Sequence, residues 1–195
     1  DYLVITVPAE EISSILDEIS RIDLKEDKVI FDISTFKSDF IDEYKRLSHH
    51  LKVASAHPMF GEGVDTLKDE NVIVVPVKGR EHEAEDVESF FEEFGANVSS
   101  MKVKEHDELM KVLIGIPYFF GISYLSLISD FEDIEKYGGT SFEFLSTYGK
   151  AVLNDSSEFI EDVIYHSRDK IKEILEESKP DQIDIKELIR IYEDE

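Results

Sequence analysis

The residue best suited to chemistry in this sequence is His57, which follows the short apolar segment 53–56 and precedes Pro58. The segment has the composition of a buried strand, and ligands of parallel α/β sheets bind beyond the carboxyl ends of the strands. An imidazole changes its charge near neutral pH, so a histidine at this place can serve as an acid or a base. A loop histidine held by backbone hydrogen bonds would occupy the same position, and position alone favours neither interpretation.

Two other strand ends carry candidate residues. Val7 and Pro8 end the apolar run at 2–7, and Ser34 and Thr35 lie at the end of the run at 28–33. Further strands are expected at 53–56, at 71–77 and from residue 97 onward, and amphipathic helices at 10–22, 36–51 and 86–94. Strands that alternate with such helices predict an α/β domain with a parallel sheet covered on both faces.

The second half of the chain has a different pattern, because no strand signal remains after about residue 104. Helices are expected at 105–127, 142–153, 158–177 and 185–192. We therefore predict an α/β domain over residues 1–103 and an all-α domain over residues 104–195. The first of these helices is apolar on too many sides for a surface helix, which predicts that it is buried in a bundle or against a partner subunit.

Composition restricts the partners and the compartment. The 195 residues include 21 Lys and Arg against 45 Asp and Glu, and the resulting charge of −24 would repel nucleic acid and anionic membranes. Cysteine is absent, which excludes thiolate chemistry and is compatible with the cytoplasm. No apolar run reaches ~18 residues, so no membrane span is expected. The His49-His50 pair has no further ligand candidates, so no metal site is predicted.

Three motifs together resemble those of the prephenate dehydrogenase family. His57-Pro58-Met59-Phe60-Gly61 looks like the family's His-Pro-Met-Phe-Gly signature. Asp32-Ile33-Ser34-Thr35-Phe36-Lys37 resembles its Asp-x-x-Ser-x-Lys strand end, with Thr35 in place of the serine. Glu105-His106-Asp107-Glu108-Leu109-Met110 resembles the opening of its first dimerisation helix. The order and spacing agree from residue 1 to about residue 167, and residues 168–195 carry no motif that can be placed.

The resemblance implies an activity and roles for the strand ends. Members of the family transfer the C4 hydride of prephenate to NAD or NADP while the ring loses its carboxylate as CO2, which yields 4-hydroxyphenylpyruvate for tyrosine biosynthesis. In this interpretation His57 accepts the proton of the C4 hydroxyl, and Thr35 hydrogen-bonds the same hydroxyl or the nicotinamide region. The cofactor contacts implied in this chain are Val7, Pro8 and Ser34.

The resemblance also implies substrate contacts from the helical domain. Prephenate is a dicarboxylate, and the family meets it with an arginine from a Gly-Arg pair, which aligns here with Gly149 and Lys150. A lysine keeps the charge but loses the bidentate fork, and a solvated lysine at a helix end fits equally well. A polar residue and a histidine of the family are replaced by Ile114 and Tyr118, of which only Tyr118 offers a hydroxyl. His106 completes the predicted substrate contacts, although capping or interfacial roles are open.

Several alternatives stay open at this level. Arogenate, which carries an amino group in place of the keto oxygen, competes with prephenate as substrate. A non-catalytic dimerisation or regulatory module of the same fold is the alternative from another class. Lys37 either anchors the start of its helix or touches the substrate. The family forms dimers through its helical domain, so a homodimer is expected.

The dinucleotide fingerprint Gly-x-Gly-x-x-Gly is missing, because the nine glycines never take that spacing after a strand. The resemblance therefore implies the C-terminal half of a Rossmann-like parallel sheet followed by a helical dimerisation domain. We expect such a chain to bind NAD or NADP weakly or not at all, since only Val7, Pro8 and the Ser34-Thr35 turn are left to contact the cofactor. The choice between NAD and NADP has no determinant here.

Overall fold

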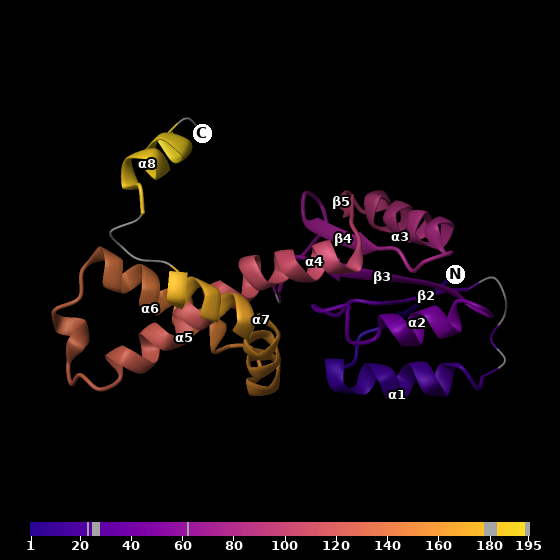
Figure 1. Ribbon diagram of the computed structural model, residues 1–195, viewed down its shortest axis with the longest axis horizontal. Helices are drawn as coiled ribbons and strands as arrows, with labels where there is room; N and C mark the ends of the chain where they lie inside the picture. Colours follow the sequence, from indigo (N-terminus) through magenta and orange to yellow (C-terminus); the bar gives the residue numbers. More distant parts are fainter. Residues whose placement is uncertain (23, 25–27, 62, 178–182, 194–195) are drawn as a thin grey trace. The chain divides into compact units, whose positions relative to one another are not determined.

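The computed structural model describes residues 1–22, 24, 28–61, 63–177 and 183–193, and it divides into two units, Asp1–Met110 and Lys111–Glu195 (Figure 1). The sequence placed the division between residues 103 and 104. Helix α4 (Val103–Met110) groups instead with the sheet, because its His106 and Asp107 side chains are hydrogen-bonded to residues of the first unit.

Five strands form a single sheet in the first unit. In order across the sheet they are β1 (Tyr2–Ile5), β2 (Val29–Asp32), β3 (Lys52–Pro58), β4 (Asn71–Val75) and β5 (Asn97–Ser100). Each apolar run from which a strand was predicted is therefore a strand. The central strands β2, β3 and β4 are buried over most of their length, as a near-continuous apolar run requires.

The direction of β4 corrects the prediction of a wholly parallel sheet. β1, β2 and β3 are parallel to one another, whereas β4 runs antiparallel to β3, and β5 is parallel to β4. A parallel return needs a long crossover, which is usually a helix. The described part of the connection between β3 and β4 contains no helix, so the chain turns back and pairs beside β3 in the opposite sense.

Helices cover both faces of the sheet, as predicted (Figure 1). α1 (Ala9–Ile19) and α2 (Ile41–Leu47) pack on one face, and α3 (Glu81–Glu93) packs on the other. Side chains alternate along β2 accordingly, since Ile30 joins the first core and Phe31 the second. Fully burying a side chain of this size contributes roughly 1.5–3 kcal/mol, so the two cores hold the strand ends in place.

The second unit is helical throughout its described elements, as expected. A π-helical turn at Lys111–Gly115 (η1) leads into α5 (Ile116–Ile128), and a 3₁₀ turn (η2, Ile134–Lys136) precedes α6 (Thr140–Val152), α7 (Ser157–Glu177) and α8 (Ile185–Glu193). The predicted helix at 105–127 is thus three consecutive pieces. The π turn supplies an irregularity that the period of apolar residues does not reveal.

Small residues let the helices of the second unit approach closely. A Cβ atom on Gly149 of α6 would lie 2.7 Å from the carbonyl oxygen of Gly121 on α5, so the two backbones are in direct contact. A Cβ on Gly115 would lie 1.8 Å from the Ser167 hydroxyl of α7. These positions accept only glycine in the present packing.

One helical segment departs from the expectation that nothing in the chain is suited to cross a membrane. Residues Val103–Ile128 are long and apolar enough to do so by length and composition alone, and no charged residue occurs between Val112 and Ile128. The sequence argument counted uninterrupted apolar residues, whereas such helices tolerate glycine, proline and hydroxyl side chains. Only 11% of the most apolar 18-residue window is buried by the chain itself. Most of that window is therefore left uncovered by the described residues.

We predict that Gly149→Ala destabilises the protein by about 1–3 kcal/mol, because the added methyl group would lie 2.7 Å from the backbone oxygen of Gly121 and 2.6 Å from Cγ of Leu125. Urea denaturation of the two proteins measures the difference. Thr147→Ala, an exposed change on the same helix, is the matched control and should leave the free energy of unfolding within about 0.5 kcal/mol of the parent. An unchanged stability for Gly149→Ala contradicts the close approach of α5 and α6.

Candidate active site

Asp32 ends β2, and its carboxylate is fully buried. The Ser55 hydroxyl on β3 donates to its Oδ1 at 2.6 Å, and the backbone N–H and hydroxyl of Ser34 both donate to its Oδ2. The ammonium group of Lys37 lies 2.8 Å from the same Oδ2. A buried carboxylate stays charged only when it is paired and hydrogen-bonded, and these contacts meet that condition.

Lys37 is as deeply buried as its partner. Its Nζ also donates to the carbonyl oxygen of Ala56 on β3 at 2.5 Å. Burial raises the pKa of Asp32, but the charge of Lys37 and the hydrogen bonds outweigh it and leave the pKa below its usual value. Burial lowers the pKa of Lys37, and Asp32 offsets part of that effect. Lys37 is thus an internal ion-pair partner, which is neither of the two roles considered from the sequence.

A second buried carboxylate connects α4 to the loop after β2. The backbone N–H of Lys37 donates to Oδ1 of Asp107 at 3.0 Å, and that of Ser38 donates to Oδ2 at 2.8 Å. The neighbouring His106 is 0% exposed, and its Nδ1 lies 2.8 Å from Oδ1 of Asp107. The loop that carries Ser34 and Thr35 is therefore held at one end by Asp32 and at the other by Asp107.

His57 lies at the centre of this cluster. Its Nδ1 is 3.1 Å from Nε2 of His106, and the two rings meet edge to face. Nε2 of His57 forms no hydrogen bond with any of the described residues, so it is available to a ligand. Burial lowers the pKa of His57 well below its usual value, Lys37 and His106 lower it further, and Asp32 and Asp107 only partly oppose them.

This arrangement is suited to removing a proton. A neutral imidazole with one free nitrogen can accept a proton from a hydroxyl group within ~2.6–3.2 Å. A depressed pKa keeps the ring neutral at physiological pH, so the base needs no prior deprotonation. Thr35 is half-buried in the loop after β2, and its hydroxyl makes no hydrogen bond with the described residues, which leaves it available to a ligand as well.

The other predicted residues have ordinary surroundings. Val7 packs at the border of the first core, and the exposed Pro8 precedes α1. In the second unit, the Tyr118 hydroxyl donates to Asp155 at 2.5 Å, and burial together with that carboxylate raises its pKa. The side chain of Lys150 is 63% exposed and lies 3.5 Å from Glu135, a surface pair of small energetic value.

The helices that cover the sheet do not fit a pyrophosphate group. α1 follows Pro8, which has no N–H to offer, and its first turn carries Glu10 and Glu11. The first turn of α2 contains Asp42 and Glu43, and that of α3 contains two further glutamates. Acidic side chains oppose an anion at a helix start, so the starts of these three helices are poorly suited to hold a phosphate group.

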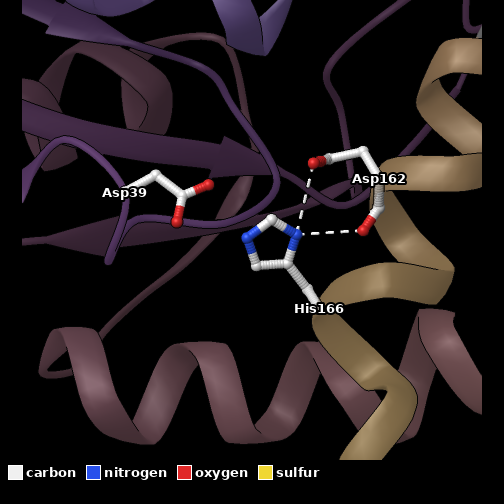
Figure 2. A group of neighbouring side chains, drawn as sticks. All are labelled: Asp39, Asp162 and His166. Carbon is white, nitrogen blue, oxygen red and sulfur yellow. Dashed lines mark hydrogen bonds and ion pairs between the residues drawn. The ribbon is translucent and has the colours of Figure 1, made fainter.

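Histidine and carboxylate side chains also meet on α7, one turn apart (Figure 2). His166 Nδ1 lies 2.9 Å from the carbonyl oxygen of Asp162 and 3.2 Å from its carboxylate, and burial of the ring is partial. Asp39, drawn in the same figure, belongs to the first unit. The expectation that the chain carries no metal site stays a prediction.

A family model of the prephenate dehydrogenase nucleotide-binding domain matches residues 1–100 of the chain. The chain belongs to the prephenate dehydrogenase family. The motif resemblance is thereby confirmed at the level of the family, and the cluster around His57 falls within the part of the chain that the family model covers or directly after it. No match exists among curated proteins.

Solved structures of prephenate and arogenate dehydrogenases share the fold. Prephenate dehydrogenase from Aquifex aeolicus, in complex with hydroxyphenyl propionate and NAD+, matches with a TM-score of 0.77 and 19% identity over 100% of this chain and 71% of that one. A second structure of prephenate dehydrogenase from A. aeolicus matches with a TM-score of 0.69 and 18% identity, over 99% of this chain and 76% of that one. Arogenate dehydrogenase from Synechocystis matches with a TM-score of 0.67 and 12% identity, over 90% of this chain and 68% of that one. The predicted fold class, a Rossmann-like sheet followed by helices, is confirmed.

Four members of the cluster were not among the predicted site residues: Asp32, Lys37, Ser55 and Asp107. Asp32 and Asp107 lie within the family motifs, and their position beside a strand end and beside His106 was the available signal. Lys37 and Asp107 are 70 positions apart in the sequence, so no local sequence pattern predicts the contact between them.

We predict that Lys37→Met destabilises the protein by about 3–5 kcal/mol, because it leaves the Asp32 carboxylate buried without its counter-charge. The double variant Asp32→Asn/Lys37→Met should lose clearly less than the sum of the two single changes. Urea denaturation of all four proteins gives the coupling energy. Lys45→Met, which breaks an exposed pair with Asp42, is the control and should cost under about 1 kcal/mol. Additive effects of the two buried changes contradict the pairing.

Proposed function

We propose that this protein is an NAD- or NADP-dependent prephenate dehydrogenase that acts in tyrosine biosynthesis in the cytoplasm. The observation that carries the proposal is the buried His57, whose Nδ1 is engaged by His106 and whose Nε2 is free. A decayed site would have no reason to retain a buried ion pair and two buried histidines at a strand end. Family membership and the fold of the solved relatives support the same conclusion.

The proposed reaction converts prephenate to 4-hydroxyphenylpyruvate and CO2. The C4 hydroxyl gives its proton to Nε2 of His57 as the C4–H bond breaks and a hydride leaves, which makes C4 a carbonyl carbon. The bond from the ring to its carboxylate then breaks, its electron pair makes the ring aromatic, and the resulting phenolate oxygen takes the proton back from His57. A nicotinamide cofactor supplies the hydride acceptor when it is bound. The residues of this chain contribute the base and the orientation of the hydroxyl, for which Thr35 is the proposed hydrogen-bond partner.

Substrate recognition in this proposal uses Lys150 for a carboxylate and Tyr118 for a polar contact, both in the second unit. The chain has five arginines, so an exposed lysine near the end of α6 is a natural source of positive charge for a dianionic substrate. Arogenate is the competing substrate, and the fold of Synechocystis arogenate dehydrogenase supports its inclusion in every assay. A non-catalytic module of the same fold is the alternative that a turnover assay excludes or establishes.

We predict that His57→Asn lowers kcat for prephenate by about 10²–10⁴-fold in the full-length protein, because the base is lost while the fold is kept. His82→Asn, an exposed change on α3, is the control and should retain full activity. In the parent protein kcat/KM should stay level as the pH falls to about 6.5 and decline only below it, since the pKa of His57 is depressed. Near-parental turnover by His57→Asn contradicts the assignment, and absence of turnover of prephenate and arogenate by the parent favours the non-catalytic module.

We also propose that the protein is a homodimer assembled through the helical unit. Val112, Leu113 and Phe120 are exposed apolar side chains on η1 and α5. Leu127 at the end of α5 and Leu145 on α6 add to this surface. A second copy of the chain offers the same apolar surface, and an isologous contact would cover both at once.

We predict that sedimentation equilibrium at micromolar concentration gives twice the mass of the chain, and that Phe120→Glu shifts the protein towards the monomer by placing a charge in the apolar contact. Glu88→Gln on α3, a change on the other unit, is the control and should leave the dimer intact. A monomeric parent protein contradicts the proposal, and so does recovery of the parent with liposomes in flotation, which assigns the apolar helix to a bilayer.

A further inference from the structure

Behind His57 lies a continuous chain of three side chains. Oδ1 of Asp107 is 2.8 Å from Nδ1 of His106, and Nε2 of His106 is 3.1 Å from Nδ1 of His57. Both ring nitrogens of His106 thus have protein partners, and the residue is 0% exposed, so it has no free polar atom for a substrate. We propose that His106 and Asp107 are positioning residues that hold His57 in the tautomer whose Nε2 is unprotonated. The catalytic consequence rests on the proposed function, in which His57 is the base.

The direction of these hydrogen bonds follows from the carboxylate of Asp107, which lies at the end of the series of three side chains. An ionised carboxylate only accepts, and Asp107 already receives the backbone N–H groups of Lys37 and Ser38. Nδ1 of His106 must therefore carry the proton in their mutual bond. A neutral His106 then has its lone pair on Nε2, which accepts from Nδ1–H of His57. The lone pair of His57 is consequently on Nε2, the nitrogen that has no hydrogen-bond partner among the residues that the structure describes.

The opposite arrangement requires a doubly protonated His106. In that case Nε2–H of His106 would donate to Nδ1 of His57, the proton of His57 would lie on Nε2, and the ring could not accept a proton there. Burying the charge of an imidazolium at 0% exposure costs free energy. The charge of Asp107 is shared among two backbone donors and the His106 ring, which weakens its pull on a second proton.

The same hydrogen bonds also stabilise His57 after it has accepted a proton. When Nε2 of His57 accepts a proton, Nδ1–H already points at His106, whose Nδ1–H points at the carboxylate of Asp107. The groups that face His57 are Asp32 at the end of β2, Lys37 in the loop after it, and His106 and Asp107 on α4. The two carboxylates favour the imidazolium, and the charge of Lys37 opposes it. The logic is that of a catalytic triad with one additional imidazole between base and carboxylate.

The tautomers can be measured without any turnover. Long-range ¹H–¹⁵N correlation spectra of histidine-labelled protein distinguish Nδ1–H, Nε2–H and imidazolium rings, with signals assigned through His57→Asn and His106→Gln. We expect His57 and His106 each to carry a single proton on Nδ1 near neutral pH. The exposed His82 serves as the reference, because it takes no part in the hydrogen bonds between His57, His106 and Asp107, and its signals should not respond to either change. A doubly protonated His106, or a proton on Nε2 of His57, overturns the proposal even in a fully active enzyme.

A matched pair of substitutions separates positioning from mere support of the fold. The amide oxygen of His106→Gln can replace Nε2 as an acceptor, whereas His106→Leu cannot. We expect His106→Leu to lower kcat by about 10²-fold with little change in KM, as a misplaced catalytic group does, and His106→Gln to recover most of that loss. A rise in KM at constant kcat overturns the proposal and makes His106 a substrate contact. Equal losses of activity for both variants at equal thermal stability also overturn it.

Asp107→Asn supplies a readout in the pH profile. Asp107 raises the pKa of His57, so removal of its charge should move the acidic limb of kcat/KM to lower pH while kcat falls. An unchanged limb overturns the electrostatic link between Asp107 and the base. If prephenate and arogenate are both inert with the parent protein, the proposed function fails, whereas the tautomer measurement still decides the present inference by itself.

Discussion

The buried ion pair between Asp32 and Lys37 is the interaction on which the site of the first unit depends. It joins the end of β2 to the following loop, and through Ser55 and the carbonyl oxygen of Ala56 it joins both to β3. The loop held in this way presents the backbone N–H groups of Lys37 and Ser38 to Asp107. Asp107 in turn fixes α4 and His106, and His106 meets His57. Each contact positions the next one along this series.

An ion pair of this kind is kept for geometry rather than for stability. A well-packed apolar pair of the same volume is often as stable as a buried salt bridge, since desolvation of two charges cancels most of their attraction. An apolar pair, however, would not place the loop in one orientation. The directed bonds from Lys37 to Asp32 and to Ala56 do so, and they also place an ammonium near His57, where burial of the ring and the charge of Lys37 both lower the pKa of the imidazole. Lys37 therefore contributes both to the position of the loop and to the electrostatics of His57.

The helical unit combines two opposite requirements in one helix. α5 approaches α6 so closely that only glycine fits at Gly149, and elsewhere on its surface α5 leaves large apolar side chains uncovered. A helix that is apolar all round needs neighbours on every side. The chain supplies some of them through α6 and α7. The remainder of the apolar surface is the place where we propose that a second copy binds, and it is also the reason that the helix has the length and composition of a membrane span.

What the sequence determined by itself was local or periodic. The five apolar runs became strands, the 3.6-residue period located the helices, and the motifs around His57, Thr35 and His106 identified the family. The tertiary structure decided the antiparallel direction of β4, the assignment of α4 to the first unit, the late start of α2 at Ile41, and the buried contacts of Lys37 and His106. The reason is physical. Periodicity records which residues face a core, whereas the pairing of Asp32 with Lys37 and of Asp107 with the loop depends on directed contacts between segments far apart along the chain, and only the folded arrangement specifies those.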